Sequence, residues 1–342
     1  MNILLVGQNM AKYNPTSLTD SFYRGLIHNN VRCNKYDLTL YITNNYFNYI
    51  VKKTPLLREK LLIKTNELLL DFLSNNHYTH LFVVKGTFLL PDTLMEIKKI
   101  HPEIKLCCFN PDDPFNNESW GGSNHANIKE SISYYDYYFI WSKGLIKKIK
   151  AYGVKNVNHI PFAIDNSVIK KFNNIPLKYN LSFIGNSDNE RQAWINRSAE
   201  LIAKNSLIKN IDVFGLYWNN YNNITLNGGR YGENYFKVFY ESKININILR
   251  NQNKGETNMR TFEIPATGNF MLHENSDAAK EFFKEDIDAV YFNSPEELVD
   301  KSEYYLKNES LRLKIAQSGY EKSLKSGYTY NDKVKEIIKI IK

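Results

Sequence analysis

The strongest constraint on the fold is an alternation of strand-like and helix-like segments through nearly the whole 342-residue chain. The strand-like segments are short apolar runs, and the helix-like segments carry apolar residues at helical spacing. The predicted strands of the first half are 3–7, 31–37, 80–86, 104–110, 137–141 and 156–162, and its predicted helices are 17–29, 55–74, 91–100 and 142–153. The predicted strands of the second half are 181–185, 211–215, 243–249 and 270–274. Its predicted helices lie near 188–205 and 235–242, and the end of the chain is predicted to be helical from 294–306 through 331–342. Such alternation predicts parallel sheets with helices on both faces.

The alternation lapses once, over residues 163–179, and then restarts. A chain of this length is long for one core and suits two domains. We therefore expect an α/β protein with one Rossmann-like domain over 1–165 and another over 178–328, followed by a helix over 329–342. Two such domains facing each other form a cleft at the carboxyl ends of their strands, where open α/β sheets bind ligands.

Composition excludes several classes of protein. An apolar fraction of 43% argues against disorder. No run of eighteen apolar residues predicts a membrane span, and the start MNILLVGQNM is typical of a strand rather than a signal peptide. The three cysteines are Cys33 and the adjacent pair Cys107 and Cys108, which we interpret as reduced core residues. A reducing cytoplasm is the expected location.

The formal charge of +8 is concentrated in part in one basic segment of the first half. Its lysines are Lys143, Lys147, Lys148, Lys150 and Lys155. They form either a solvated helix face or a surface that attracts anionic lipid or a phosphorylated acceptor, which would give a peripheral contact with the inner membrane face. Nucleic acid is not an expected partner, because no reading motif and no basic stripe with interleaved aromatics is present.

The stretch NMRTFEIPATGNFMLHE, residues 258–274, begins like a helix directly after a predicted strand and a polar loop. A helix that starts near Asn258 presents free N–H groups and partial positive charge, which suit a phosphate. Arg250, Lys254 and Arg260 lie beside this start and would add full positive charges.

Glu263 follows one turn into the same predicted helix. A carboxylate does not suit phosphate, but it accepts hydrogen bonds from two adjacent hydroxyls, so a ribose next to a pyrophosphate satisfies both features. Pro265 denies a hydrogen bond to the carbonyl of Thr261, and Gly268 allows a left-handed cap, so the helix should be short. The alternative is an ordinary helix with an acid near its positive end.

A second strand–turn–helix stretch, LSFIGNSDNERQAW (181–194), offers a nest for anions. Its strand ends at Gly185, Asn186 follows, and Arg191 can approach the turn. The dinucleotide fingerprint G-x-G-x-x-G is absent.

A third stretch, NGGRYGENY (227–235), places Gly229 and Tyr231 before a predicted helix. We interpret it as a close backbone approach to a flat base with an aromatic ring nearby. A plain turn is the alternative.

Two carboxylates in FNPDDPF, Asp112 and Asp113, follow an apolar strand of the first half and are bracketed by prolines. A rigid acidic loop at a strand end suits a general base or a group that orients a hydroxyl, although a solvated turn has the same composition. His125 is close in sequence, and a lone histidine is often structural.

Asp286 and Asp288 match the D-x-D spacing that can hold a divalent metal against a nucleotide diphosphate. They lie between a predicted helix and a short strand near the C-terminus, so we expect no metal there.

With these residues collected, the run KININILRNQNKGETNMRTFEIPATGNFMLHENSD resembles the C-terminal domain of the CgeB-like glycosyltransferases of the spore-maturation type. The segments YFNSPEELVDKSEYYL and IAQSGYEKSL are similar to the helices that follow in that family. The first half is similar through HLFVVKGTFLLPDTL, CCFNPDDPF and YYDYYFIWSKGLIKKIKAYGVKNVNHIPFAID. The most specific element is NMRTFE followed by a glycine.

The resemblance implies a GT-B fold with a glycosyl transferases group 1-like C-terminal domain that holds a nucleotide-sugar donor. It implies that Glu263 binds the ribose and that the C-terminal helix crosses back to the first domain. It implies transfer without a metal or another cofactor. Tyr231 and Gly229 remain the candidates for nucleotide binding that the stretch 227–235 indicates. The expected pyrophosphate-binding residues are Gly185, Asn186, Arg191, Lys254, Asn258, Met259, Arg260 and Thr261.

The chain departs from related retaining enzymes at one position. Many of these carry a second glutamate eight residues before the ribose-binding one, and here that position is Gly255, with Glu256 out of register. Catalytic residues therefore cannot be carried over, and the stereochemistry stays open. If the reaction inverts, the expected base is Asp112 or Asp113, with His125 as a further candidate. If it retains, the aspartates are expected to orient the acceptor.

The expected function is thus a cytoplasmic glycosyltransferase that moves a sugar from a nucleotide-diphospho-sugar, with UDP as the first expectation, to a hydroxyl of a glycan, lipid-linked or protein acceptor. Two other classes stay open. One is a nucleotide-sugar epimerase or hydrolase of the same fold, and the other is a non-catalytic protein bound to the membrane surface.

Overall fold

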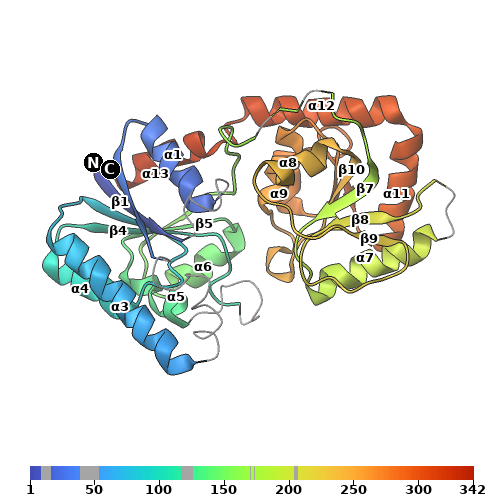
Figure 1. Cartoon of the computed structure of the whole chain (residues 1–342). Coiled ribbons are helices and arrows are strands. Elements are labelled where there is room, and N and C mark those ends of the chain that lie inside the picture. Colours follow the sequence, from blue (N-terminus) through green and yellow to red (C-terminus); the bar gives the residue numbers. More distant parts are fainter. Residues whose placement is uncertain (9–16, 39–53, 117–125, 170, 173, 204–206) are drawn as a thin grey trace. The chain divides into compact units, whose positions relative to one another are not determined.

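The structure, a computed structural model, describes residues 1–8, 17–38, 54–116, 126–169, 171–172, 174–203 and 207–342 (Figure 1). The chain divides into two compact units. The first unit comprises Met1–Pro161 and Tyr330–Lys342, and the second comprises Phe162–Thr329. Each contains one six-stranded sheet whose strands are all parallel, flanked by helices (Figure 1). The predicted pair of parallel-sheet domains is confirmed.

The sheet of the first unit has the order β2-β1-β3-β4-β5-β6. Its strands are β1 Asn2–Gly7, β2 Arg32–Asp37, β3 His80–Val84, β4 Lys105–Asn110, β5 Tyr137–Ile140 and β6 Asn156–His159. Its α-helices are α1 Leu18–His28, α3 Pro55–Ser74, α4 Pro91–Ile100, α5 Ala126–Glu130, α6 Ile146–Lys150 and α13 Tyr330–Ile341, and its 3-10 helices are η1 Ile132–Tyr134 and η2 Lys143–Leu145. Every residue of β3 is buried, as expected of a parallel strand covered on both faces.

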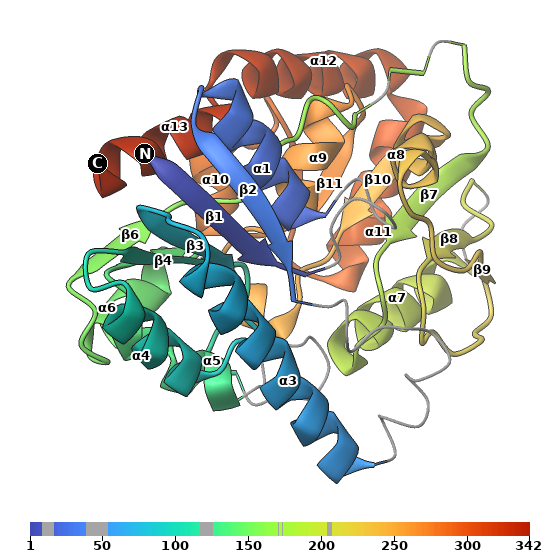
Figure 2. The ribbon, with the colours of Figure 1, turned by 60° about the vertical axis from the view of Figure 1, so that its left-hand side comes forward.

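The C-terminal helix α13 belongs to the first unit and lies beside α1 (Figure 2). The rings of Phe22 and Tyr330 lie 5.4 Å apart, and Asn29 Nδ2 donates to the carbonyl of Asn331 at 2.9 Å. At its other end, the carbonyl of Ile341 lies 3.1 Å from Nε2 of the buried His80 on β3. The last helix therefore completes the helical cover of the first sheet.

The sheet of the second unit has the order β12-β11-β10-β7-β8-β9. Its strands are β7 Tyr179–Ile184, β8 Ile211–Phe214, β9 Ile224–Leu226, β10 Ser242–Asn247, β11 Met271–Glu274 and β12 Val290–Phe292. Its α-helices are α7 Asn189–Ile202, α8 Glu233–Tyr240, α9 Met259–Ala266, α10 Asp277–Phe282, α11 Pro295–Lys307 and α12 Glu309–Lys325, and its 3-10 helix is η3 Asn251–Asn253.

This strand order has a consequence for ligand binding. The chain leaves β7 toward β8 and β9 on one side, then returns to β10 on the other side and continues to β11 and β12. The order of the strands therefore reverses between β7 and β10. In open parallel sheets, ligands bind outside the carboxyl ends of the strands at this point of reversal.

All three cysteines are buried and free, as the sequence predicts. Burial raises the pKa of the Cys33 thiol to about 12, so this thiol stays protonated near neutral pH. Among the described helices, none combines the length and the apolar character that crossing a membrane requires.

Candidate functional site

The loops after β7 and β8 touch through their backbones at the carboxyl edge of the second sheet. A Cβ atom at Gly215, the residue after β8, would lie 2.0 Å from the carbonyl oxygen of Gly185, the residue after β7. Trp218 Nε1 donates to the same oxygen at 2.9 Å, and Asn186 Oδ1 accepts from the N–H of Leu216 at 3.0 Å. Only glycine fits at Gly215, and the loop that contains Gly185 and Asn186 is held in one conformation.

We expect Gly215→Ala to destabilise the protein by about 1–3 kcal/mol, because the added methyl forces the two loops apart. In a domain of this size, such a change lowers the melting temperature by roughly 2–4 °C per kcal/mol. Thermal denaturation checks this, with Leu216→Ala as the control, since Leu216 is exposed and its truncation should change the free energy of unfolding by less than about 0.5 kcal/mol. Equal melting temperatures for the two variants would contradict the packing described.

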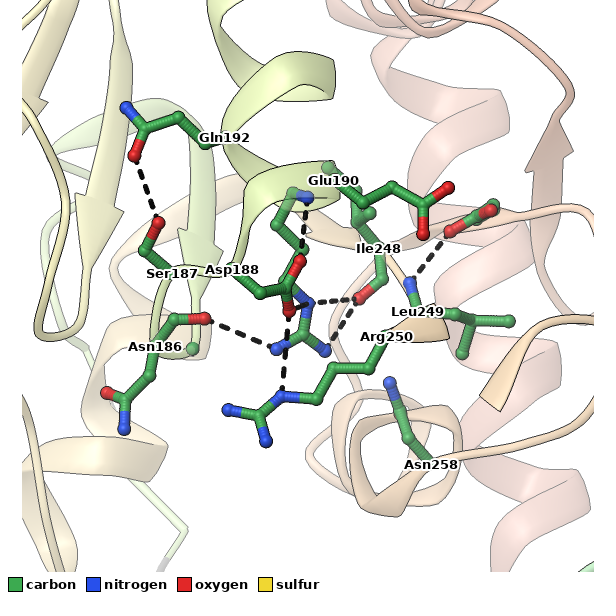
Figure 3. A network of polar contacts seen from close by, with 12 residues as sticks. Asn186, Ser187, Asp188, Glu190, Gln192, Ile248, Leu249, Arg250 and Asn258 are labelled. Atoms are coloured by element: carbon green, nitrogen blue, oxygen red, sulfur yellow. Dashed lines mark hydrogen bonds and ion pairs between the residues drawn. The ribbon is translucent and has the colours of Figure 1, made fainter. Parts of the chain in front are cut away.

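Arg191 joins the loops on the two sides of the point of reversal. The side chain of Asp188 caps α7, and its Oδ1 accepts from the N–H of Arg191 at 2.9 Å. The guanidinium donates from Nε and Nη2 to the carbonyl of Ile248, at 3.1 and 2.9 Å, and from Nη1 to the carbonyl of Asn186, at 3.3 Å (Figure 3). Arg191 is only 3% exposed. This side chain therefore fixes the shape of the loops that surround the candidate site.

Two further guanidinium groups lie near Arg191. Arg250 Nε is 3.7 Å from Asp188 Oδ2, which is 3.7 Å from Arg191 Nε as well (Figure 3). Arg260 donates from Nε to Asn247 Oδ1 at 3.3 Å, and its guanidinium carbon lies 6.0 Å from the ring centre of Phe183. Burial and the charge of Arg260 lower the pKa of Arg191. The crowding of three cations favours an anion beside them.

Lys254, the fourth cation of the region, is held by two carboxylates. Its ammonium pairs with Glu190 on α7 and lies 3.5 Å from Oε1 of Glu274 on β11. Glu274 Oε2 accepts from the N–H of Leu249 at 2.8 Å (Figure 3). Burial lowers the pKa of Lys254, but the two carboxylates raise it by more, so the net effect is a raised pKa. A phosphate at this position would have to compete with two carboxylates.

The start of α9 is closed by a reciprocal cap. Asn258 Oδ1 accepts from the N–H of Thr261 at 3.1 Å, and Thr261 Oγ1 accepts from the N–H of Asn258 at 3.1 Å. The N–H groups of Met259 and Arg260, at the first two helical positions, have no acceptor within an α-helix. These two donors are therefore the ones that α9 presents to a ligand.

A buried polar network holds this cap in place. The side-chain amides of Asn247 and Asn258 exchange two hydrogen bonds of 3.0 and 2.8 Å. His273 Nε2 lies 2.9 Å from Thr261 Oγ1, and burial lowers the pKa of His273 to about 4, so it is neutral near pH 7. The helix start is consequently fixed before any ligand arrives.

The helix is as short as the sequence predicts. It ends at Ala266, one residue after Pro265, and Gly268 follows with a φ of +76°. Proline has no N–H to give to the carbonyl one turn earlier, and glycine adopts the left-handed conformation without a steric penalty. The chain thus turns from the site directly into β11.

Glu263, on α9, is in contact with α8. Its side chain is 8% exposed, and its Oε2 accepts from the hydroxyl of Tyr235 at 2.6 Å. Burial raises the pKa of Glu263, while the hydrogen bond from Tyr235 and the charge of Arg260 oppose that shift. Sequence reasoning selected Glu263 but missed Tyr235, because nothing in the sequence indicates that the third residue of α8 meets the fifth residue of α9.

The loop before α8 carries Gly229 and Tyr231. Tyr231 is 64% exposed, and a Cβ atom at Gly229 would lie 2.9 Å from its hydroxyl oxygen. The close approach that this glycine allows is therefore to the ring of Tyr231 itself. The guanidinium of Arg230 lies 5.3 Å from the ring centre of the buried Phe214, the last residue of β8.

The two aspartates of the first unit have different partners. Lys85 Nζ, directly after β3, donates to Asp112 Oδ2 at 2.6 Å. Asp112 donates its N–H to Asn110 Oδ1, whereas Asp113 Oδ1 accepts from the N–H of Phe115 at 2.9 Å. His125, the other candidate in this region, lies outside the described residues. The structure thus links Asp112 to a lysine that sequence reasoning did not select.

Lys85 has an unusual backbone conformation, with a φ of +67°. Among the described residues, the other non-glycine residues with positive φ are Asn30, Asn174, Tyr217, Asn223 and Asp286. Four of these five residues are Asn or Asp, whose short polar side chains tolerate positive φ. A lysine in this conformation is strained. Strain of this kind is concentrated at functional sites.

We expect Lys85→Gly to be more stable than Lys85→Ala by about 1 kcal/mol, because both variants lose the ion pair with Asp112 and only glycine relieves the backbone. Lys98, in α4, provides the control, since it pairs with Asp136 at 2.7 Å from a helical backbone. There the order reverses, and Lys98→Gly is less stable than Lys98→Ala by up to about 1 kcal/mol. Urea denaturation of the four variants checks this, and the same order at both positions would contradict it.

Comparison with known proteins agrees with this architecture. Residues 191–339 match the family model described as glycosyl transferase-like. A search of curated proteins finds no match. HepE of Anabaena in complex with UDP-glucose is similar in structure, with 10% identity, a TM-score of 0.66 and 99% of each chain covered.

Two other solved structures cover this chain completely. Sucrose-phosphate synthase of Thermosynechococcus elongatus has 8% identity and a TM-score of 0.69, with 98% of that chain covered. The apo structure of OtsA has 12% identity and a TM-score of 0.67, with 99% of that chain covered. At sequence identities of 8–12%, these structural similarities are evidence for the fold alone. The chain therefore has the GT-B fold that its sequence predicts, and its residues 191–339 match the glycosyl transferase-like family.

Proposed function

We propose that this chain is a glycosyltransferase that moves a sugar from a nucleotide-diphospho-sugar, most simply a UDP-sugar, to a hydroxyl acceptor. The observation that carries the proposal is the arrangement at the reversal point of the second sheet, where the preformed start of α9, Arg250 and Arg260 lie together and Glu263 follows one turn later. The match of residues 191–339 supports it, as do the UDP and UDP-glucose complexes of HepE. Within the superfamily, we propose the CgeB-like branch, on the NMRTFE motif.

In the proposed reaction, the leaving group is a nucleoside diphosphate. As the bond to the sugar breaks, negative charge develops on the diphosphate oxygens. The N–H groups of Met259 and Arg260 and the guanidinium groups of Arg250 and Arg260 are the donors that we assign to this charge. Because Arg250 faces Asp188 in the structure, donor binding exchanges that contact for one with phosphate.

The remaining predicted donor residues have supporting roles in the proposal. Glu263 accepts hydrogen bonds from the ribose, and the ring of Tyr231 lies against the base beside Gly229. The loop of Gly185 and Asn186 lines the diphosphate. Arg191, Lys254, Asn258 and Thr261 act mainly by holding the loops and the helix start, because their side-chain bonds go to the protein.

For the acceptor side, we assign different roles to the two aspartates. Asp112 is engaged by the ammonium of Lys85, so it orients the acceptor together with that lysine. Asp113 takes the acceptor proton if the reaction inverts, and His125 remains the second candidate for that role. If the reaction retains, both aspartates orient the acceptor. No metal and no further cofactor is part of the proposal.

We further propose a cytoplasmic enzyme that can contact an anionic membrane surface. All five lysines of the basic segment are exposed, and four lie in or beside η2 and α6. Such a segment gains about 1 kcal/mol per lysine near an anionic leaflet. A lipid-linked acceptor fits this contact, while glycan and protein acceptors remain within the proposal.

A thermal-shift panel tests the donor class. UDP, GDP, CDP, ADP and NAD are added separately, with and without EDTA. A ligand at 100 times its dissociation constant stabilises the protein by about 2.7 kcal/mol, which raises the melting temperature by several degrees. We expect the largest shift with UDP, unchanged by EDTA. Product analysis with and without acceptor then separates transfer from hydrolysis and epimerisation. No shift with any nucleoside diphosphate would overturn the proposal.

A further inference from the structure

We propose that Tyr235 is a positioning residue that orients the carboxylate of Glu263 for the donor ribose. This inference rests on the proposed function, because it concerns the same donor site. Nothing in the sequence motif or in the comparisons points to Tyr235. The inference comes from the contact between α8 and α9.

The hydroxyl of Tyr235 has little freedom to move. It lies 2.6 Å from Glu263 Oε2, the short distance typical of a hydrogen bond to a charged oxygen. The ring of Tyr235 packs edge-on against two buried rings, those of Phe236 and Phe239, each with a centroid distance of 5.2 Å. The direction from which the hydroxyl approaches Glu263 is therefore fixed.

The charge of Glu263 depends on few neighbours. Burial raises the pKa of Glu263, and the described groups that lower it are Tyr235 and Arg260. Burial and the charge of Glu263 raise the pKa of Tyr235 well above its usual value, so the phenol keeps its proton and acts as the donor. Without the hydroxyl, Arg260 alone would oppose the effect of burial.

The chemistry of a ribose explains why this matters. Its two hydroxyls bind best to an ionised carboxylate, which only accepts hydrogen bonds. A protonated carboxyl has an O–H donor of its own and binds a diol less well. With Oε2 held by Tyr235, Oε1 is the oxygen turned to the sugar. Loss of the Tyr235 hydroxyl should therefore weaken ribose binding. It should also raise the pKa of Glu263, so that ribose binding requires a higher pH than in wild type.

The test compares Tyr235→Phe with Tyr240→Phe. Tyr240 lies on the same helix and packs its ring against Phe172 at 5.3 Å, so it is a matched control for the loss of a phenol. Isothermal titration gives the dissociation constants of UDP and of inorganic pyrophosphate from about pH 5 to about pH 9, a range that spans the titration of a raised carboxyl. Because UDP itself titrates near pH 6, the quantity compared is the ratio of variant to wild type.

We expect Tyr235→Phe to weaken UDP binding roughly tenfold at neutral pH, the effect of one hydrogen bond to a charged group. Its affinity for UDP should recover toward wild type as the pH rises. Because the Tyr235 hydroxyl also contacts the side chain of Arg260, pyrophosphate affinity should fall too, but by less than UDP affinity and without recovery at higher pH. Tyr240→Phe should match wild type throughout.

Equal and pH-independent losses of UDP and pyrophosphate affinity would overturn the inference, since they would assign Tyr235 a purely structural role. Unchanged UDP affinity in Tyr235→Phe would also overturn it. A wild-type protein that binds pyrophosphate but not UDP would overturn the proposed function, and this inference with it.

Discussion

Glu263→Gln should weaken UDP binding by roughly 10- to 100-fold, the effect of losing one hydrogen bond from a ribose hydroxyl to a charged carboxylate at about 1.5–3 kcal/mol. The amide keeps the shape of the side chain and can still accept the bond from Tyr235. The expected loss is therefore specific to the donor. Isothermal titration with UDP measures it directly.

The same substitution should leave the free energy of unfolding unchanged or increase it near neutral pH. Burial raises the pKa of Glu263 in the folded protein, so the folded state binds this proton more tightly than the unfolded state. The stability due to this group is present at low pH and is lost as the pH rises from the unfolded pKa to the folded one. Glutamine does not titrate, so the Glu263→Gln variant does not lose stability over this pH range.

The control for this prediction is Glu321→Gln on α12, where the carboxylate is exposed and lies outside the site. It should change neither UDP binding nor stability. A Glu263→Gln protein that is strongly destabilised but binds UDP as wild type does would indicate that Glu263 only joins α8 to α9.

Asp113→Asn should lower the rate of transfer by roughly 10²- to 10⁴-fold in an inverting reaction, the usual contribution of a general base. Its UDP affinity should equal that of wild type, because Asp113 lies in the first unit and the proposed donor site lies in the second. The measurement is kcat with saturating donor and acceptor, together with a UDP titration.

Asp112→Asn is the matched comparison for this prediction. Because Lys85 engages Asp112, this change should act mainly on the Michaelis constant of the acceptor. A large fall in kcat for Asp112→Asn with none for Asp113→Asn would reverse the two roles. A product of retained configuration would contradict a general-base role for Asp113. Both aspartates would then be residues that orient the acceptor.

The long elements of the fold could be predicted because their local signals agree with their environment. The predicted helix 55–74 has the same bounds as α3, which begins with a proline at its first position. Likewise, the apolar run at 80–86 becomes the fully buried β3. These segments are long or uniformly apolar, so neighbouring structure does not change their local preference.

Short elements were not predicted because they contain too few residues to show a hydrophobic periodicity. β9, with three residues, and α5, with five, were not expected. The predicted helix over 142–153 is instead the 3-10 turn η2 followed by α6, and the side chain of Ser142 makes no capping bond there. Tertiary contacts, not local propensity, decide such segments.

The candidate site could be predicted in its position but not in its contacts. The motif around Glu263 indicates a helix after a strand, and the fold puts that helix beside the reversal of strand order. The bond from Arg191 to the carbonyl of Ile248 spans 57 residues, and no local pattern indicates it. The same holds for Tyr235 and Lys85, whose roles depend on where α8 and the turn after β3 direct them.

A crystal structure with bound UDP tests the central claim most directly. The account predicts diphosphate oxygens about 2.7–3.2 Å from the N–H groups of Met259 and Arg260, and a ribose hydroxyl at a similar distance from a carboxylate oxygen of Glu263. UDP bound elsewhere, with Glu263 in contact with Tyr235 but not with the nucleotide, would contradict it.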